Sequence, residues 1–131
     1  LLVNDFTWKA RKDRSLIVFE GHAMRTMCHV VDAARAFLHC LGLHETGHEI
    51  FNVGSVAISK TGICAAIKAQ VPEFCYIEEQ FTSDPDARDY RVSQAKLEAT
   101  GYKSSMTLED GIAELLKGYR GLMNSRHSNM P

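Results

Sequence analysis

One stretch of the chain, from Arg25 to Leu41, places the strongest constraint on the fold. It reads as a short apolar strand over residues 26–30 and then an amphipathic helix over residues 32–41. Asp32 stands where an N-cap is needed, since its carboxylate can accept hydrogen bonds from the free N–H groups of a first turn. Arg25 directly precedes the strand, and its planar guanidinium is suited to binding phosphate through two hydrogen bonds at once. The apolar positions at helical spacing are Val30, Ala33, Ala34, Phe37, Leu38 and Leu41.

Size and charge narrow the class of protein. A chain of 131 residues can form one domain with a core, and its net charge of −1 gives no basic footprint for nucleic acid. No apolar run reaches membrane-spanning length, and the apolar start is too short for a signal peptide. The chain begins with Leu rather than Met, so we expect a fragment of a longer protein. Its cysteines lie singly among apolar neighbours, so we expect reduced thiols and a cytoplasmic location.

The remaining elements follow from apolar patterns and helix-end signals. Ser59 is expected to cap a helix that Pro72 ends. Thr107 and Asp110 have the spacing of a capping box at the start of the last helix. With about five helices and about four short strands, the pattern predicts an α/β or α+β fold. Helices are predicted over residues 3–12, 59–71, 93–99 and 108–119, and strands over residues 15–19, 49–54 and 73–78.

Residues 44–48 match the zinc-protease pattern His-Glu-x-x-His, which needs a continuous helix so that both histidines share one face. Gly42 and Gly47 bracket the match, and a polar helix-to-strand connection is the favoured interpretation. A looser zinc site formed by Cys40, His44 and His48 is the weaker alternative, and we predict no metal. A nucleophilic Cys28 assisted by His29 is also conceivable. Adjacent residues on a strand point to opposite faces, however, so His29 is expected to make a structural hydrogen bond instead.

Arginines also flank a tyrosine later in the chain, in the segment 84–93. Arg88, Tyr90 and Arg91 could line the rim of a phosphate- and sugar-binding site. Asp84, Asp86 and Asp89 lie among them, so a salt-bridged surface loop is the alternative. The residues alone favour that alternative, because exposed clusters of charged residues usually have no binding role.

Several segments together resemble the extended short-chain dehydrogenase/reductases, the NAD-dependent nucleotide-sugar epimerases and dehydratases. The Arg25–Ala36 stretch is similar to their Arg-Asp-Phe/Tyr-Ile-His/Tyr-Val-x-Asp-Val-Ala segment. The other matching pieces occur in the family's order and cover nearly the whole chain. They are residues 2–6, 15–21, 49–55, 88–93 with Lys96 and Leu97, 101–102 and 107–112. Glu20 departs from the pattern, since the family's strand usually ends in Tyr/Phe-Gly.

The resemblance implies roles for particular residues. Arg25 matches the arginine that contacts the substrate diphosphate, and Arg88 or Arg91 lies where a second diphosphate contact is found. Asn4 and Tyr90 are candidates for contact with the nucleotide or the sugar. The implied substrate is a nucleotide-diphosphate sugar, the implied cofactor is NAD, and no nucleic acid or membrane partner is expected.

The sequence contains neither Gly-x-Gly-x-x-Gly nor Tyr-x-x-x-Lys, the family's NAD turn and catalytic pair. We therefore expect residues 1–124 to be the C-terminal, substrate-binding part of such an enzyme, a small mixed α+β lobe of a Rossmann-type fold, with a disordered tail at 125–131. Alone it should be inactive, because the N-terminal NAD-binding domain would hold the cofactor and the catalytic residues. The apolar faces at 30–41 and around Phe51 should pack on that domain or cause self-association, for example as a dimer.

The sequence is also compatible with two other functions. One is a non-catalytic nucleotide- or protein-binding module derived from the family, and the other is a small metalloprotein built on His44 and His48.

Overall fold

The computed structural model describes residues 2–43, 48–79 and 88–121. Within these residues it contains five helices and four strands, in the proportion that the sequence predicts. The helices are α1 (Leu2–Lys12), α2 (Val30–Leu41), α3 (Lys60–Gln70), α4 (Ala95–Glu98) and α5 (Leu108–Gly121). The strands are β1 (Ser15–Phe19), β2 (Met24–Met27), β3 (Val56–Ser59) and β4 (Cys75–Glu79). The expected tail at 125–131 lies outside the described residues.

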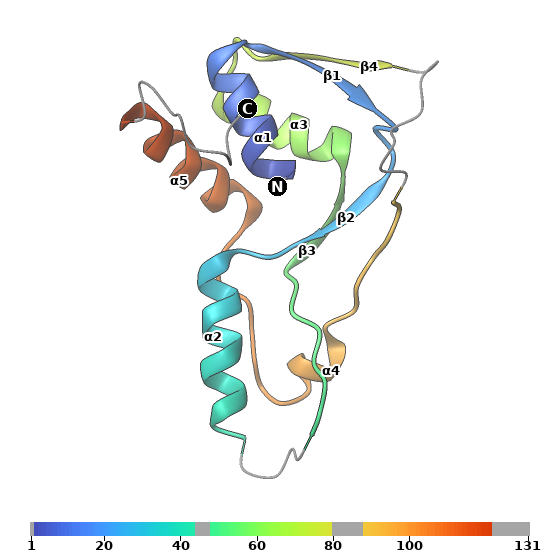
Figure 1. Ribbon diagram of the computed structural model, residues 1–131, viewed down its shortest axis with the longest axis vertical. Helices are drawn as coiled ribbons and strands as arrows, with labels where there is room; N and C mark the ends of the chain where they lie inside the picture. Colours follow the sequence, from blue (N-terminus) through green and yellow to red (C-terminus); the bar gives the residue numbers. More distant parts are fainter. Residues whose placement is uncertain (1, 44–47, 80–87, 122–131) are drawn as a thin grey trace.

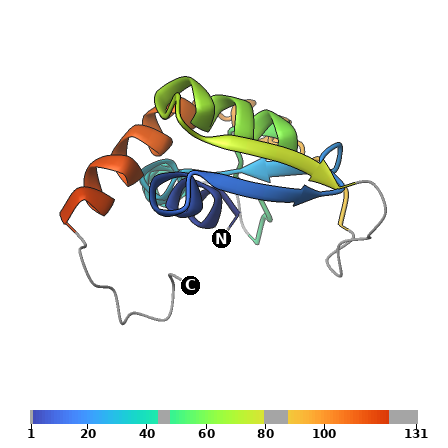
Figure 2. The ribbon, with the colours of Figure 1, turned by 90° about the horizontal axis from the view of Figure 1, so that it is seen from above.

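The strands form two small two-stranded sheets, and the β2–β3 sheet runs between the two ends of the molecule (Figure 1). β1 pairs with β4 in parallel, and the two strands run side by side with α1 and α3 next to them (Figure 2). β2 pairs with β3 antiparallel, with Arg25 opposite Ile58. Figure 1 shows α1, α3 and α5 at one end of the molecule and α2 and α4 at the other, with β2 and β3 running between them.

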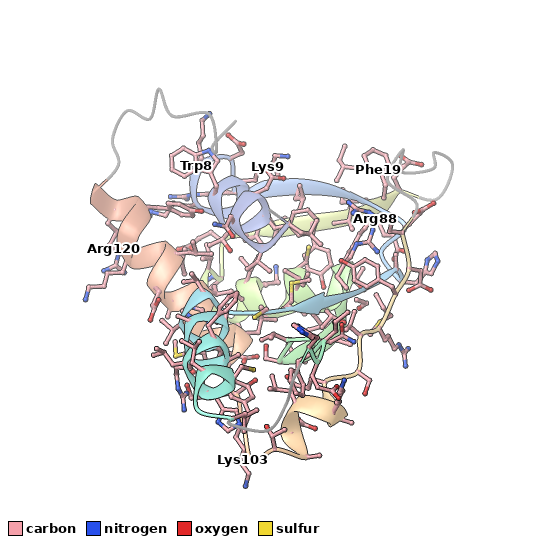
Figure 3. The ribbon with its side chains drawn as sticks, turned by 60° about the horizontal axis from the view of Figure 1, so that its bottom comes forward. Trp8, Lys9, Phe19, Arg88, Lys103 and Arg120 are labelled. Carbon is pink, nitrogen blue, oxygen red and sulfur yellow. The ribbon has the colours of Figure 1, made fainter. Side chains whose placement is uncertain are left out.

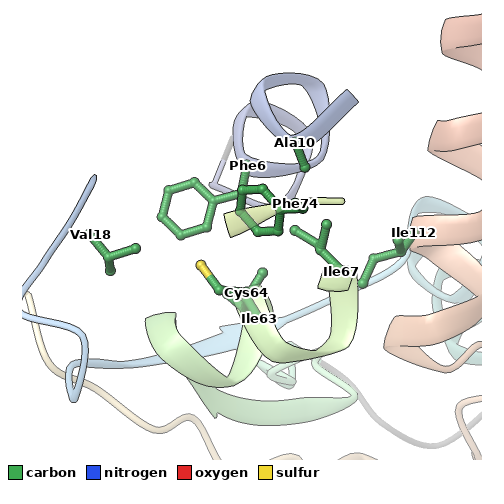
Figure 4. Close-up of a cluster of buried hydrophobic side chains, with 8 residues drawn as sticks. All are labelled: Phe6, Ala10, Val18, Ile63, Cys64, Ile67, Phe74 and Ile112. Carbon is green, nitrogen blue, oxygen red and sulfur yellow. The ribbon is translucent and has the colours of Figure 1, made fainter. Parts of the chain in front are cut away.

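The main core fills the space between α1, α3, α5 and the β1–β4 sheet (Figure 4). Each helix contributes a stripe of apolar residues at helical spacing, and β1 contributes Val18 because alternate side chains of a strand point to the same face. Complete burial of an Ile or Phe side chain contributes about 1.5–3 kcal/mol, so this cluster is the principal source of stability. Its members are Phe6, Ala10, Val18, Ile63, Cys64, Ile67, Phe74 and Ile112.

A second, smaller core lies at the other end, where Ala36 of α2 packs against Leu97 and Tyr102. The Tyr102 hydroxyl donates to the backbone carbonyl of Asp32 at 2.7 Å. Burial and the nearby Asp32 charge raise the pKa of Tyr102, so the hydroxyl keeps its proton and its role as a donor.

Several predicted helix ends are confirmed. The Ser59 hydroxyl accepts a hydrogen bond from the N–H of Gly62 at 3.0 Å and so caps α3, which ends at Gln70 before Pro72. Thr107 and Asp110 form the predicted capping box, in which the Asp110 N–H donates to the Thr107 hydroxyl at 3.1 Å and the Thr107 N–H donates to the Asp110 carboxylate at 3.0 Å.

The predicted start of α2 is wrong. The helix begins at Val30, and its N-cap is His29, whose Nδ1 accepts the N–H of Val31 at 3.2 Å. The strand before it is Met24–Met27, so Arg25 lies within β2 rather than before it. Asp32 lies inside the first turn, fully buried, and its carboxylate accepts hydrogen bonds from a distant segment of the chain. The predicted structural hydrogen bond of His29 is confirmed, although His29 is not a strand residue.

The predicted strand at 49–54 is also wrong. These residues have no strand partner, and β3 begins only at Val56. Side chains hold the segment instead. Lys96 donates to the carbonyl of Ile50 at 3.0 Å, and Gln94 accepts the N–H of Gly54 at 3.3 Å. Lys96 is also paired with the Glu49 carboxylate, which anchors the segment to α4.

One backbone position departs from ordinary geometry where the sequence departs from the family. Glu20 has φ = 49°, in the left-handed region that favours glycine. The family's usual glycine would adopt this conformation without the steric cost that a side chain brings.

The outward face of α2 is apolar and uncovered. Phe37, Leu38 and Leu41 are 74 %, 70 % and 80 % exposed, and Val30 lies on the same stripe. Ile50, in the unpaired segment 49–54, is also exposed. An apolar face of this kind marks a surface for packing against another body. None of the described helices is long and apolar enough to cross a membrane.

Candidate functional site

The candidate site is a cleft of about 1050 Å³ between the start of α1, strand β2 and one face of α5. Arg25, Lys60, Arg88 and Tyr90 are among its lining residues, and so is Asn4. The fold therefore brings together four of the five residues that the sequence selects for the site.

Arg25 is the central residue of this cleft. It is only 6 % exposed, its Nη1 donates to the carbonyl of Met24 at 2.9 Å, and its guanidinium lies 5.5 Å from the centroid of the Tyr90 ring. A guanidinium at this distance from an aromatic ring is attracted by the ring's quadrupole. The side chain is thus held in place in the wall of the cleft, which is a favourable arrangement for binding an anion because little rotamer freedom is left to lose.

Tyr90 owes its position to the segment 89–92, which runs beside β2. The N–H of Tyr90 donates to the carbonyl of Met24 at 3.2 Å, and the N–H of Val92 donates to the Thr26 hydroxyl at 2.8 Å. The Asp89 carboxylate accepts the N–H of Met24 at 2.8 Å. The Asp89 side chain therefore fastens this segment to the backbone of β2. Asp84 and Asp86 of the alternative salt-bridged loop lie outside the described residues.

The structure separates the two candidate arginines of this segment. Arg88 lines the cleft, and Figure 3 shows its side chain extending inward from the segment. Arg91 is exposed and is not among the residues that line the cleft. Residues 88 and 90 share one side of an extended segment and residue 91 takes the other, which explains the difference.

Asn4 lies at the start of α1, at the edge of the cleft. The Tyr119 hydroxyl donates to the Asn4 carbonyl at 3.1 Å and so joins α5 to α1. The Asn4 side chain is half-buried and can offer both a donor and an acceptor to a ligand.

Sequence reasoning missed Lys60, which also lines the cleft. It is the first residue of α3 and is 2 % exposed, and its Nζ donates to the carbonyl of Phe19 at 3.0 Å. A lysine at the first position of a helix is usually a surface residue, so no local sequence pattern indicates that Lys60 lines the cleft.

The conceivable Cys28–His29 nucleophile pair, which the sequence argues against, is not formed. The Cys28 thiol lies 3.5 Å from the carbonyl of its neighbour and not against the imidazole, whose Nε2 is 3.3 Å from a Glu114 carboxylate oxygen. Burial and the Asp32 charge both raise the pKa of the Cys28 thiol, which disfavours the reactive thiolate.

The described residues contain no group of three or more His, Cys, Asp or Glu side chains able to hold a metal ion. Residues 44–47 of the His-Glu-x-x-His match lie outside the described part, and His48 is exposed. All four cysteines are free thiols, as the sequence predicts.

The turn from β3 into α3 does not fit a site for the dinucleotide of NAD. Such a site needs a strand-to-helix turn whose free amides face the pyrophosphate. β3 runs directly into α3, but the first amides of that helix are bound by protein groups: Lys60 donates to Ala23 at 3.2 Å and Thr61 donates to Gly21 at 3.0 Å. This turn therefore offers no free amides to a pyrophosphate.

The fold defines a class. The chain has the fold of part of a Rossmann-type extended short-chain dehydrogenase/reductase, and the resemblance to the NAD-dependent nucleotide-sugar epimerases and dehydratases is confirmed at the level of fold. No family model matches the chain.

Individual solved structures give the extent of the likeness. A UDP-glucose 4-epimerase with UDP-glucose from Thermotoga maritima is 21 % identical over 91 % of this chain, with a TM-score of 0.71. A UDP-N-acetylglucosamine 4-epimerase from Bacillus cereus is 19 % identical over 95 %, with a TM-score of 0.74. A dTDP-glucose 4,6-dehydratase from Bacillus anthracis, in complex with NAD, is 19 % identical over 92 %, with a TM-score of 0.70. The chain spans 39 %, 42 % and 39 % of their lengths, respectively.

Proposed function

We propose that residues 1–124 are the substrate-binding part of an NAD-dependent nucleotide-sugar epimerase or dehydratase, and that they hold the nucleotide diphosphate while another domain carries out the hydride chemistry. The observation that carries this proposal is the buried Arg25, held between the Met24 carbonyl and the Tyr90 ring in the wall of a large cleft. The similarity to structures of nucleotide-sugar enzymes supports the same function.

Each lining residue has a role in this proposal. Arg25 donates two hydrogen bonds to the diphosphate, a geometry that a planar guanidinium provides and an ammonium does not. Arg88 assists from the rim, and we favour it over Arg91 because only Arg88 lines the cleft. Asn4 and Tyr90 contact the nucleotide or the sugar. We assign no catalytic residue to this chain.

The partner that supplies the chemistry would be an N-terminal NAD-binding domain. The uncovered face of α2 and the unpaired segment 49–54 are the surfaces proposed to pack against it, since both expose apolar side chains. Without that domain, the same surfaces would favour a homo-oligomer. Free thiols at all four cysteines fit a cytoplasmic protein, and the proposed substrates would place it in carbohydrate metabolism.

Calorimetric titration with UDP-glucose and GDP-mannose tests the binding role. The wild-type chain should bind at least one of them, and Arg25→Ala should weaken binding about 10- to 100-fold, since a hydrogen bond to a charged group contributes about 1.5–3 kcal/mol. Arg25→Lys keeps the charge but loses the paired N–H donors of the planar guanidinium, so it should show an intermediate affinity. Circular dichroism must show that both variants are folded. A wild-type chain that binds no nucleotide sugar, or a folded Arg25→Ala variant that binds as tightly as wild type, would disprove the proposal.

The absence from the sequence of a glycine-rich turn and of Tyr-x-x-x-Lys favours a second candidate, a non-catalytic nucleotide- or protein-binding module. Mixing the chain with a separately expressed NAD-binding half of an epimerase distinguishes the two. Epimerisation that appears only in the mixture supports the enzyme part, whereas ligand binding without any activity supports the module.

A further inference from the structure

A second, smaller cavity lies apart from the candidate cleft, where the C-terminal ends of α1 and α3 meet α5. None of its lining residues lines the cleft. Its volume is about 170 Å³, below the roughly 300–1,000 Å³ of pockets for drug-sized ligands. A cavity of this size suits a small ion or a single ionic group of a larger ligand. We call it the arginine pocket, because Arg11, Arg14 and Arg120 line it.

The arginine pocket has an excess of positive charge. The charged groups among its lining residues are the three arginines and one carboxylate, that of Glu73, which leaves a net charge of +2. Within residues 2–43, 48–79 and 88–121, none of the three arginines forms an ion pair. Three like charges around one small cavity repel each other, and an anion with two negative charges offsets that repulsion.

The walls of the arginine pocket are held by the main core. Ala10 is fully buried, and Val71 and Leu116 are half-buried and pack against the core cluster. The Gln70 side-chain amide donates to the carbonyl of Glu109 at 2.9 Å and so ties the end of α3 to the start of α5. Apolar groups beside the arginines displace water, which strengthens the attraction between the arginines and an anion. The pocket is therefore formed before any ligand binds.

Arg14 is the residue of the pocket that helix-end chemistry explains least. Its φ is 56°, in the left-handed region, where glycine commonly ends a helix without steric cost. Its backbone is fixed on both sides, since its N–H donates to the Lys9 carbonyl at 3.0 Å and its carbonyl accepts the N–H of Cys75 at 2.9 Å. Strained residues of this kind cluster at functional sites. An arginine at this position therefore indicates a function for its side chain.

We infer that Arg11, Arg14 and Arg120 bind a doubly charged oxyanion, either inorganic phosphate or the phosphate group of a small phosphorylated molecule. A planar guanidinium donates two hydrogen bonds at once to one phosphate group. The net charge of the pocket matches that of a phosphate dianion, and the volume suits one phosphate group rather than a nucleotide. The inference goes beyond the proposed function and does not depend on it.

The competing explanation is that the arginines only offset helix dipoles. Arg11 lies in the last turn of α1 and Arg120 in the last turn of α5, where a positive charge stabilises the helix. Under this explanation, a substitution changes stability by the same amount with and without phosphate. Arg14→Gly separates the two explanations, because it removes the guanidinium together with the backbone strain. The variant should be no less stable than wild type and yet bind phosphate more weakly.

The test is calorimetric titration of the whole chain with inorganic phosphate and with glycerol 3-phosphate at constant ionic strength. Wild type should show saturable binding. Arg14→Gly, Arg11→Gln and Arg120→Gln should each weaken it about 3- to 10-fold, because water partly screens these exposed side chains. Arg91→Gln is the matched control, since Arg91 is exposed but lines neither cavity, and it should keep wild-type affinity.

The two ligands identify the source of the phosphate group. Binding of glycerol 3-phosphate as well as inorganic phosphate supports a phosphorylated small molecule, and binding of inorganic phosphate alone supports the free ion. The location of the site is checked by NMR, because the amide resonances of Arg14 and Val71 should shift on addition of phosphate.

Four results would overturn the inference. They are no saturable binding by wild type, wild-type affinity in a folded Arg14→Gly variant, an equal loss in Arg91→Gln, and resonance shifts confined to residues of the cleft. Titrated with UDP-glucose, the arginine-pocket variants should match wild type, because the pocket lies outside the cleft. The proposed function and this inference can therefore fail separately.

Discussion

Asp32 and Ser105 are joined by two hydrogen bonds, because one carboxylate oxygen of Asp32 accepts both the backbone N–H and the hydroxyl of Ser105 at 2.9 Å. The other oxygen accepts the N–H of Met106 at 3.0 Å, and Arg35 lies 3.3 Å from the carboxylate. Asp32 is fully buried, so these partners replace the water that a carboxylate would otherwise bind. The contact fixes α2 to the segment that leads into α5.

Replacing Asp32 with Asn should therefore destabilise the chain by about 1–3 kcal/mol, since it removes a buried acceptor and leaves an N–H of the 105–106 segment without its partner. The free energy of unfolding from urea titration measures this. Asp13→Asn is the control, because Asp13 is exposed and a surface substitution of this kind changes stability by less than about 0.5 kcal/mol. Equal stability of the two variants would show that the Asp32 contacts contribute nothing.

The same contacts make the stability of the chain depend on pH in the acid range. Burial alone would raise the pKa of Asp32, but the hydrogen bonds from Met106 and Ser105 and the charge of Arg35 outweigh it and hold the pKa below its ordinary value. The folded state thus binds the proton more weakly than the unfolded state. The stability that Asp32 provides is complete above the ordinary carboxyl pKa of about 3.9 and is lost as the pH falls through the lower, folded value.

Wild type should therefore lose more stability than Asp32→Asn between about pH 5 and pH 3. Thermal melts across this range measure the difference. Asp110, whose pKa is lowered by its hydrogen bonds from the Thr107 hydroxyl and N–H, should leave a residual acid dependence in the variant. Parallel curves for the two proteins would contradict the prediction.

Local signals in the sequence were sufficient to predict the helix ends. They could not predict contacts between residues that lie far apart in the chain. Ser59 and Thr107 bind amides three residues away, so their capping roles follow from spacing alone. The partners of Asp32 lie more than 70 positions later, and no local pattern announces them. Residues 49–54 have the composition of a strand, but strand formation depends on which segment lies beside them, and β2 pairs with β3 instead.

The candidate site likewise contains some residues that the sequence identifies and others that only the structure places. Arg25 and Asn4 could be selected from residue type and from the family pattern. Arg88 could not be distinguished from Arg91, because the phase of the 88–92 segment is set by its hydrogen bonds to β2. Lys60 could not be found at all, since only the β2–β3 register places it in the cleft.

The difference between the two arginines is itself testable. Arg88→Ala should weaken the binding of a nucleotide-diphosphate sugar about 3- to 10-fold, less than Arg25→Ala, because Arg88 is exposed and water screens its charge. Arg91→Ala removes the same charge from the same segment, but outside the cleft, and should change the affinity by less than about twofold. Isothermal titration measures both, and an equal loss in the two variants would mean that only overall charge matters.

Glu20 gives a prediction about backbone strain. A left-handed backbone costs a residue with a side chain about 1–2 kcal/mol, and glycine avoids that cost but gains freedom in the unfolded state. Glu20→Gly should therefore raise the free energy of unfolding by up to about 1 kcal/mol. Gly101, with φ = 93° and open space around it, is the opposite case, and Gly101→Ala should lower stability. Urea titrations with the same sign for both variants would show that backbone conformation does not decide either effect.

The uncovered face of α2 leads to a prediction about association. Phe37 and Leu41 are 74 % and 80 % exposed and contribute little to the core, so the double variant Phe37→Ser, Leu41→Ser should differ from wild type by less than about 0.5 kcal/mol for each position. Leu97→Ala, at a fully buried position, should cost about 2–5 kcal/mol.

The double serine variant should reduce self-association more than Leu97→Ala does, because exposed apolar area drives association and buried apolar area drives folding. In sedimentation velocity at increasing concentration, wild type should form dimers or larger species, and the double serine variant should remain monomeric. A wild-type chain that stays monomeric and unfolds in one cooperative transition would show that the α2 face needs no partner. The face would then be an ordinary surface, and the packing role proposed for it would have to be abandoned.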